Sequence, residues 1–318
     1  MKLLSGHFAV LAALVGLMLV LGLLLAAYRW YRPAPVPNER QLALMDLMQG
    51  KEFVYRGDRG KLTLPYRLFM PERTRTDNTK ADSTNADSTN ADNTKAKALP
   101  LILVLHASTG RGDNNFSQLS PAVEQLTSAK LQSLSAAAVI VPQCPKGVEW
   151  TDVKPSGPPY GNYAMAGTTV SERFKAVLAL IDDVIANYPI DQRRIYITGS
   201  SMGASATWQF LYHFPHVFAA AIPMNGRTDP SQAAIIGQTP LWMFHGIRDK
   251  VAPIENSRAM QAALEAQGIP SQLTELDAGH GIEYESFTPE TYLWLLQQEL
   301  TTAPRSEREN TASGKKYE

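Results

Sequence analysis

The sequence is poor in cysteine and carries no net charge. Cys144 is the single cysteine among 318 residues, so the chain cannot form an internal disulfide bond. This absence alone does not fix the compartment in which the protein works. Thirty Lys and Arg residues balance thirty Asp and Glu residues, so no overall field attracts nucleic acid or acidic lipid. We therefore expect no nucleic-acid partner.

Charged residues are missing from the apolar segment Phe8–Ala27. As a helix, these twenty residues span about 30 Å, which is the thickness of a bilayer's hydrocarbon core. The segment is longer than the apolar region of a cleavable signal peptide, and the aromatic and basic residues after it suit a membrane interface. We predict an uncleaved membrane anchor in residues 1–32, with a cleaved signal peptide as the alternative. The flanking charges leave the orientation open, and an anchor of this kind favours a periplasmic or other extracytoplasmic domain.

Large apolar residues are also missing from residues 74–98. The unit ADSTN occurs at Ala81 and again at Ala86, and a variant follows. A segment without large apolar side chains cannot offset the entropy of folding, so we expect a disordered insertion. Alternating prolines predict an extended spacer over residues 33–50, and a polar composition predicts a flexible tail over residues 301–318.

Residues 51–300 alternate strand-like and helix-like patterns, apart from the insertion. Short apolar runs predict strands, and single apolar faces predict helices. Their alternation predicts an α/β domain with a mostly parallel sheet covered by helices on both faces. The expected strands are Lys61–Met70, Pro100–Ala107, Ala136–Gln143, Arg194–Thr198, Phe218–Met224, Pro240–His245 and Ser271–Asp277. The expected helices are one opened by a capping box of Thr169 and Glu172, one ending near Phe214, and those at Ser257–Gln267 and Thr291–Leu300.

The stretch GSSMGASATW, Gly199–Trp208, stands between an expected strand and an expected helix. Gly199, Ser201 and Gly203 fit the G-x-S-x-G pattern of a nucleophile elbow. The turn is so tight that a side chain two residues before or after the serine would collide with neighbouring backbone. The serine then lies at a helix N-terminus, where free N–H groups favour negative charge. This spacing selects Ser201, rather than Ser200, as the candidate nucleophile.

A serine nucleophile needs a base and a carboxylate that orients the base. In α/β domains with a nucleophile elbow, the three residues follow along the chain in the order Ser, acid, His. His280 lies in a loop after an expected strand and is the candidate base, whereas His213 and His216 lie at the far end of the elbow helix. Asp249 follows the end of another expected strand and is the candidate acid. Asp277 competes with it, but this residue lies close before His280 and is expected to shape that loop.

The reaction also needs N–H donors that stabilise a developing oxyanion. The N–H of Met202 is one candidate, and the loop Leu105–Asn115 offers the second through Ala107 or Ser108. His106 in this loop is expected to fix it by hydrogen bonds. The sequence contains no metal-binding cluster, phosphate loop or dinucleotide fingerprint, so we expect no metal and no cofactor.

Several motifs occur in the order typical of a known family. The stretches LPYRLFMPE, LHASTGRGDNN, VPQCPKGVEW, IDQRRIYITGSSMGASATW, FPHVFAAAIPMNG, LWMFHGIRDKVAP and DAGH resemble the α/β-hydrolase esterases and predicted peptidases of the prolyl-oligopeptidase-like and polyhydroxybutyrate-depolymerase-like group. The resemblance runs from about Leu64 to Leu300, apart from the insertion. It implies the α/β-hydrolase fold, with Ser201 as nucleophile, Asp249 as acid and His280 as base.

The resemblance also implies which residues border the substrate cleft. These are Trp150 and the loop Pro158–Tyr163, with Tyr160 and Tyr163 as the candidate substrate-binding side chains. A thiol hydrolase of the dienelactone type would need a cysteine nucleophile. Cys144 lies outside the elbow, so we expect it to be buried and inert.

Two positions depart from the family's pattern. The family commonly has glycine where this chain has Ala107, and a second glycine where it has Ala204. If Ala107 has to adopt a positive φ, the loop is strained by about 1 kcal/mol or more, and the oxyanion donors are displaced. These departures put activity in question rather than fold.

The residues and the resemblance together predict a serine hydrolase that cleaves carboxylic esters, of small molecules or polymers, through an acyl-enzyme. A serine peptidase of the same fold is one alternative, because the two reactions share their mechanism. A catalytically silent, membrane-tethered binding protein is the other, motivated by Ala107 and Ala204. The sequence does not indicate an oligomeric state.

Overall fold

The computed structural model describes residues 14–22, 35–71, 98–153 and 163–301. The chain divides into two compact units, Met1–Pro37 and Asn38–Glu318, which we describe separately. In the first unit, residues 14–22 are helical. Among the described residues, no helix is both long enough and apolar enough to span a bilayer. The rest of the predicted anchor, the ADSTN insertion and nearly all of the predicted tail lie outside the described residues, so the anchor and the location inferred from it stay predictions.

The second unit begins with helix α2, Glu39–Leu47, and not with an extended spacer. Asn38 and Gln41 form a capping box, in which each side chain accepts a hydrogen bond from the other residue's backbone N–H. Leu44 is buried against the core of the unit. The spacer predicted for residues 33–50 is therefore wrong from Asn38 onward, because the proline pattern ends before this capping box.

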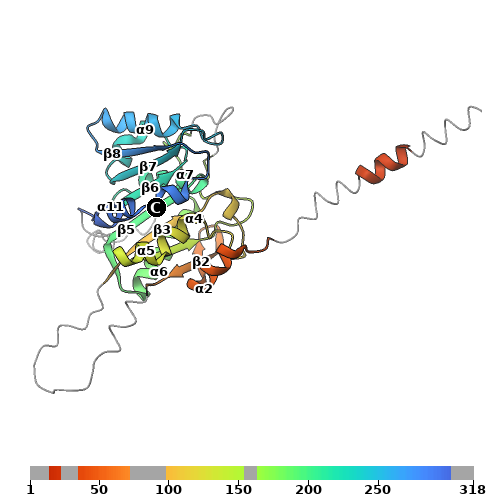
Figure 1. Cartoon of the computed structure of the whole chain (residues 1–318), viewed down its shortest axis with the longest axis horizontal. Coiled ribbons are helices and arrows are strands. Elements are labelled where there is room, and N and C mark those ends of the chain that lie inside the picture. Colours follow the sequence, from red (N-terminus) through yellow and green to blue (C-terminus); the bar gives the residue numbers. More distant parts are fainter. Residues whose placement is uncertain (1–13, 23–34, 72–97, 154–162, 302–318) are drawn as a thin grey trace, which may run out of the picture. The chain divides into compact units, whose positions relative to one another are not determined.

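A single sheet of eight strands forms the centre of the second unit, in the order β1-β2-β4-β3-β5-β6-β7-β8 (Figure 1). β1 pairs antiparallel with β2 and β2 with β4, whereas the six strands from β4 to β8 in this order run parallel. The predicted mostly parallel sheet is thus confirmed. The strands are β1 Gln49–Gly57, β2 Gly60–Phe69, β3 Leu99–Leu105, β4 Ala138–Pro142, β5 Ile190–Ser200, β6 Ala220–Met224, β7 Leu241–Gly246 and β8 Ser271–Leu276.

The direction of β2 decides where the chain enters the parallel part of the sheet. Phe69, at the end of β2, pairs with Val139 near the start of β4. Val139 pairs on its other side with Ile102, in the middle of β3. Leu99, the first residue of β3, pairs with Ile190, the first residue of β5. The end of β2 and the start of β3 therefore lie beside the amino ends of the parallel strands, opposite their carboxyl ends.

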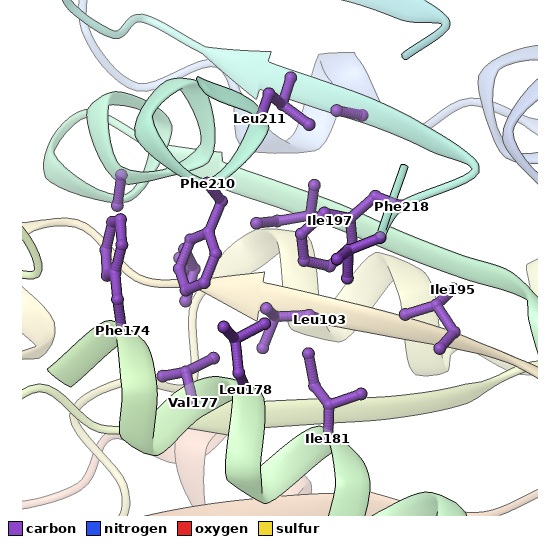
Figure 2. Close-up of a cluster of buried hydrophobic side chains, with 14 of the residues drawn as sticks. Leu103, Phe174, Val177, Leu178, Ile181, Ile195, Ile197, Phe210, Leu211 and Phe218 are labelled. Atoms are coloured by element: carbon purple, nitrogen blue, oxygen red, sulfur yellow. The ribbon is translucent and has the colours of Figure 1, made fainter. Parts of the chain in front are cut away.

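Helices cover both faces of the sheet. Successive side chains of β3 point to opposite faces, so Leu103 packs with one cluster that includes α6 and α7, and Ile102 with the other, which includes α4, α5 and α11. Figure 2 shows the first cluster between α6, α7 and the strands. The helices are α4 Pro121–Thr127, α5 Ala129–Leu134, α6 Glu172–Asn187, α7 Met202–His213, α8 Ala233–Ile236, α9 Glu255–Glu265, α10 Glu283–Ser286 and α11 Pro289–Gln297, with short 3₁₀ helices η1 Ser108–Gly110 and η2 Pro230–Gln232.

Helix α6 has the predicted apolar face but a different start. Ser171 is its N-cap, and the Ser171 hydroxyl accepts from the Phe174 N–H at 3.1 Å. The capping box predicted for Thr169 and Glu172 is therefore wrong by two residues. Phe174 stacks on Phe210 of α7 with ring centroids 3.9 Å apart, which joins the two helices on one face of the sheet (Figure 2).

Candidate active site

The turn between β5 and α7 holds Ser201 in an unusual backbone conformation, with φ 56° and ψ −114°. A residue with a side chain adopts such angles only where its surroundings enforce them. Here the Ser201 N–H donates to Met224 O on the neighbouring strand at 2.9 Å, and Ser201 O accepts from the Ser205 N–H at 3.0 Å. Ser200, which ends β5, is almost fully buried. The strand and the helix therefore fix the turn and leave Ser201 as the more accessible serine.

Gly199 and Gly203 lie where no side chain fits. A Cβ on Gly203 would come within 1.9 Å of Leu105 O, and a Cβ on Gly199 within 2.4 Å of the carbonyl carbon of Gly203. Both contacts are with backbone, which cannot swing aside as a flexible side chain can. The predicted need for glycine on both sides of Ser201 is thus confirmed.

Ala204 fits at the elbow because the facing loop has no side chain at the point of contact. A Cβ on Gly226, just after β6, would lie 2.5 Å from the Ala204 Cβ. The space that the family's second glycine would leave is thus taken by the Ala204 methyl group, against Gly226. This departure from the family's pattern is accommodated by packing.

Ser201, Asp249 and His280 meet at the carboxyl ends of β5, β7 and β8. His280 Nε2 lies 2.8 Å from Ser201 Oγ, and His280 Nδ1 lies 2.7 Å from Asp249 Oδ2. An ionised carboxylate can only accept hydrogen bonds, so Nδ1 carries the proton that faces Asp249. Nε2 then has a free lone pair for the Ser201 hydroxyl. The hydrogen-bond pattern thus assigns a tautomer that can take a proton from Ser201.

Asp249 is held by a second layer of hydrogen bonds. Its side chain is fully buried, and Oδ1 accepts from the N–H groups of Val251 and Ala252 at 2.7 and 3.0 Å. His245 Nε2 donates to Ala252 O at 2.8 Å and lies 3.5 Å from Asp249 Oδ2. The Ser257 hydroxyl donates to His245 Nδ1 at 2.7 Å, and burial lowers the pKa of His245, which keeps the ring neutral. His245 therefore supports the turn that holds Asp249.

The other acid and base candidates lie elsewhere. Asp277 is exposed and forms an ion pair with Arg248. His213 lies at the end of α7, with Nε2 3.1 Å from the hydroxyl of Thr168. The structure therefore brings Asp249, and not Asp277, against His280.

Ala107, in the loop after β3, lies in an ordinary backbone conformation. Ala107 has φ −66°, so the strain that a positive φ would impose is absent. Ala107 O accepts from the Gly110 N–H at 2.9 Å, which closes the turn that contains Ser108. Met202 is the first residue of α7, where a backbone N–H has no acceptor within its own helix. The Cβ position of Gly203 lies 3.0 Å from His106 O, so the loop and the start of α7 are in close contact.

His106 fixes this loop by hydrogen bonds, as predicted. The Cys144 N–H donates to His106 Nε2 at 2.9 Å, so Nδ1 carries the proton and donates to Ala107 O at 2.6 Å. Trp150 donates from its indole N–H to His106 O at 3.3 Å. Burial, together with a smaller effect of the charge of Arg111, lowers the pKa of His106 to about 4, although the hydrogen bond to Ala107 O opposes the shift.

The neutrality of His106 makes stability depend on pH. An unfolded histidine takes up a proton below about pH 6.5, whereas folded His106 resists protonation until about pH 4. The stabilisation is therefore complete above the unfolded pKa and is lost as the pH falls toward 4, by at most about 3 kcal/mol. We expect His106→Gln to lose less free energy of unfolding than the wild type between pH 7 and pH 4. Denaturant unfolding at a series of pH values measures this, and parallel curves for the two proteins would contradict it.

Two of the residues expected to border the cleft are enclosed by protein. Trp150 is fully buried beneath His106, and Tyr163 is 6% exposed, with its hydroxyl 3.3 Å from the Thr151 hydroxyl. In this structure neither offers a surface to a substrate, because both rings fill the core beside the loop. Their assignment as substrate-binding residues is therefore corrected to support of the loop. Tyr160 lies outside the described residues.

Cys144 is buried, as predicted, and its thiol stays protonated. Burial raises the pKa of the thiol to about 12, and Sγ lies 3.7 Å from Val148 O. A cysteine acts as a nucleophile through its thiolate, so this group lacks the required form at neutral pH. Its backbone N–H, rather than its sulfur, has the structural role of binding His106.

Comparison with known proteins finds hydrolases among the proteins that are similar to this chain. Residues 135–290 match the model of the Dienelactone hydrolase family. A thermostable esterase has a similar structure, with TM-score 0.62 and 28% identity over 81% of this chain. The chain covers 64% of that esterase, which is less than two thirds of its length. No curated protein matches the sequence.

Two further structures share the fold at lower identity. One is FphF, a fluorophosphonate-binding serine hydrolase of Staphylococcus aureus, with TM-score 0.53 and 15% identity over 79% of this chain and 99% of that chain. The other is an acylaminoacyl peptidase of Pyrococcus horikoshii, with TM-score 0.51 and 15% identity over 82% of this chain and 43% of that chain. The sheet topology, the family match and these structures agree, and the chain belongs to the α/β-hydrolase superfamily.

Proposed function

We propose that this protein is a serine esterase with Ser201 as its nucleophile, His280 as its general base and Asp249 as the carboxylate that orients the base. Ser201 Oγ attacks the ester carbonyl carbon while His280 Nε2 takes the hydroxyl proton. The carbonyl oxygen becomes an oxyanion, which the N–H of Met202 and that of Ala107 or Ser108 stabilise. His280 then gives the proton to the leaving alcohol, and an acyl-enzyme remains. Water releases the acid by the same steps.

The observation that supports this proposal most directly is the hydrogen-bonded chain from Asp249 through His280 to Ser201, with distances of 2.7 and 2.8 Å. A buried carboxylate on one ring nitrogen and a serine hydroxyl on the other is the arrangement that general-base catalysis requires. The ordinary φ of Ala107 and the packing of Ala204 against Gly226 speak against the silent binding protein, which those two positions had motivated.

A carboxylic ester is the proposed substrate class. The similar thermostable esterase supports it at 28% identity, whereas the acylaminoacyl peptidase shares only the fold at 15% identity. A series of p-nitrophenyl esters beside a panel of fluorogenic peptides separates the two activities. Turnover of the peptides with no turnover of the esters would replace esterase by peptidase in the proposal.

Covalent labelling tests the nucleophile itself. A fluorophosphonate probe reacts with a serine only when a base activates its hydroxyl, so we expect the wild-type protein to be labelled and Ser201→Ala to remain unlabelled. Ser200→Ala is the matched control, because it removes the same group one residue away and should leave labelling unchanged. Absence of labelling in the wild type, or retention of labelling in Ser201→Ala, would overturn the proposed role of Ser201.

A further inference from the structure

Asn225 is a buried polar residue directly after β6, between the segments that carry Ser201, Asp249 and His280. The whole residue is 1% exposed, and its φ is 53°. Asn tolerates this left-handed conformation better than most residues with a side chain. The position therefore requires a residue that tolerates a positive φ. Because the residue is buried, each polar atom of its amide also needs a hydrogen-bond partner.

The amide of Asn225 has one possible orientation. Oδ1 accepts from the Gly246 N–H at 2.9 Å, and this backbone group can only donate. Nδ2 lies 2.7 Å from His280 O and 3.4 Å from Gly279 O, which can only accept. Exchanging Oδ1 and Nδ2 would break these bonds and set like groups against each other. Nδ2 is therefore a donor to the main chain of the loop that holds His280.

The backbone beside this amide connects to the other two segments. The Asn225 N–H donates to Phe244 O in β7 at 3.0 Å, and Gly246, at the end of the same strand, leads directly into the turn of Asp249. Met224 O, in the preceding residue, accepts from the Ser201 N–H at 2.9 Å. Met224 and Asn225, at the end of β6 and directly after it, thus bind three segments. These are the elbow of Ser201, the strand that leads to Asp249 and the loop of His280.

The loop of His280 depends on such an external contact. Gly279 and Gly281 flank His280 and are exposed, and a Cβ on either would meet no atom within 4 Å, so open space adjoins both residues on that side. The His280 side chain is 29% exposed, so the ring is only partly held by its surroundings. A hydrogen bond to His280 O, at the residue itself, limits the shift of the backbone that carries the ring.

We propose that Asn225 is a positioning residue for the base, which fixes the main chain of His280 so that its ring spans Ser201 and Asp249. This inference rests on the proposed function, because it assigns Asn225 a part in the same reaction. Asn225 touches none of the reacting atoms. Its loss lets the ring move out of line with Ser201 Oγ, and a displacement of about 1 Å is enough to lower kcat about 10²-fold.

Two substitutions separate positioning from folding. Asn225→Asp keeps the acceptor for the Gly246 N–H and tolerates the positive φ, but it places an oxygen against His280 O. Asn225→Gly tolerates the backbone and removes both side-chain bonds. Asn187→Asp on the exposed part of α6 is the matched control for the chemical change.

The measurements are kcat and KM for a p-nitrophenyl ester, the rate of fluorophosphonate labelling and the thermal unfolding midpoint. We expect kcat and the labelling rate of Asn225→Asp and Asn225→Gly to fall together by about 10²-fold while KM holds, because only the geometry of proton transfer changes. Asn187→Asp should match the wild type in kcat and in labelling rate. A purely structural role would lower the unfolding midpoint and leave kcat of the folded enzyme unchanged, which would overturn the inference.

The same labelling experiment distinguishes failure of this inference from failure of the proposed function. Labelling of both Asn225 variants at the wild-type rate would overturn the role of Asn225 and leave Ser201 as nucleophile. No labelling of the wild type would overturn the nucleophile and, with it, the positioning role.

Discussion

Asp249→Asn is expected to lower kcat about 10⁴-fold with little change in KM. Oδ1 of Asp249 accepts from two backbone N–H groups, so the asparagine must place its own oxygen there. Its NH₂ group then faces His280 Nδ1 and donates to it. The ring carries its proton on Nε2 instead, against Ser201 Oγ, and can no longer accept the hydroxyl proton. Initial rates with a p-nitrophenyl ester and the rate of fluorophosphonate labelling measure this loss.

Asp277→Asn is the matched control for this prediction. Asp277 lies three residues before His280 in the sequence, but its side chain is 75% exposed and is paired with Arg248. We expect the Asp277 variant to keep the kcat of the wild type. Retention of wild-type kcat by Asp249→Asn, or an equal loss in both variants, would remove Asp249 from its proposed role.

Gly203→Ala is expected to have the largest effect on stability. Alanine favours a helix over glycine by about 1 kcal/mol, so the change would be stabilising at an open helical site. At Gly203 the new methyl carbon would lie 1.9 Å from Leu105 O, and either α7 or the end of β3 has to move. Overpacking against backbone outweighs the propensity gain, and we expect a net loss of about 3 kcal/mol or more. Denaturant unfolding measures the free energy, and the labelling rate reports the displaced elbow.

Gly281→Ala is the matched control, because a Cβ at Gly281 would meet no atom within 4 Å. The same substitution there should leave the free energy of unfolding unchanged or raise it slightly, since alanine restricts the unfolded chain. Wild-type stability of Gly203→Ala would show that the close approach of α7 to β3 is not required.

The fold could be predicted where the sequence carries strong local patterns. The wholly apolar runs of β3 and β4 reflect burial on both faces of a parallel sheet, and they occur within two residues of the predicted bounds. β1 is not among the predicted strands. It is the first strand in the order of the sheet and has a neighbour on one side only, so five of its nine residues remain exposed and its apolar pattern is weak.

The candidate site was predictable in part because each of its three side chains follows a strand. The elbow pattern and the chain order pointed to Ser201, Asp249 and His280, which the fold brings within hydrogen-bond distance. Asn225 was not predictable in this way, since its partner His280 lies 55 residues further along the chain. The supporting role of His245 had a clearer signal, because His245 lies near the end of β7, four residues before Asp249.

The two departures from the family's pattern show the limit of comparing single positions. A positive φ at Ala107 was considered because glycine is common there, whereas Ala107 has φ −66° in the turn that forms. Ala204 fits because Gly226 faces it, from a segment more than twenty residues away in the sequence. Neither the φ of Ala107 nor the presence of Gly226 opposite Ala204 can be inferred from the residue type at a single position.

The entry point between β2 and β3 has a consequence for how this chain can evolve. Phe69 and Leu99 bound the segment that contains the ADSTN units. Both lie beside the amino ends of the parallel strands, whereas Ser201, Asp249 and His280 lie at the carboxyl ends. Insertions and deletions of whole units therefore leave the two attachment points, Phe69 and Leu99, at the opposite end of the parallel strands from the proposed chemistry. Copy number in that segment can drift between related chains while selection on the three site residues stays the same.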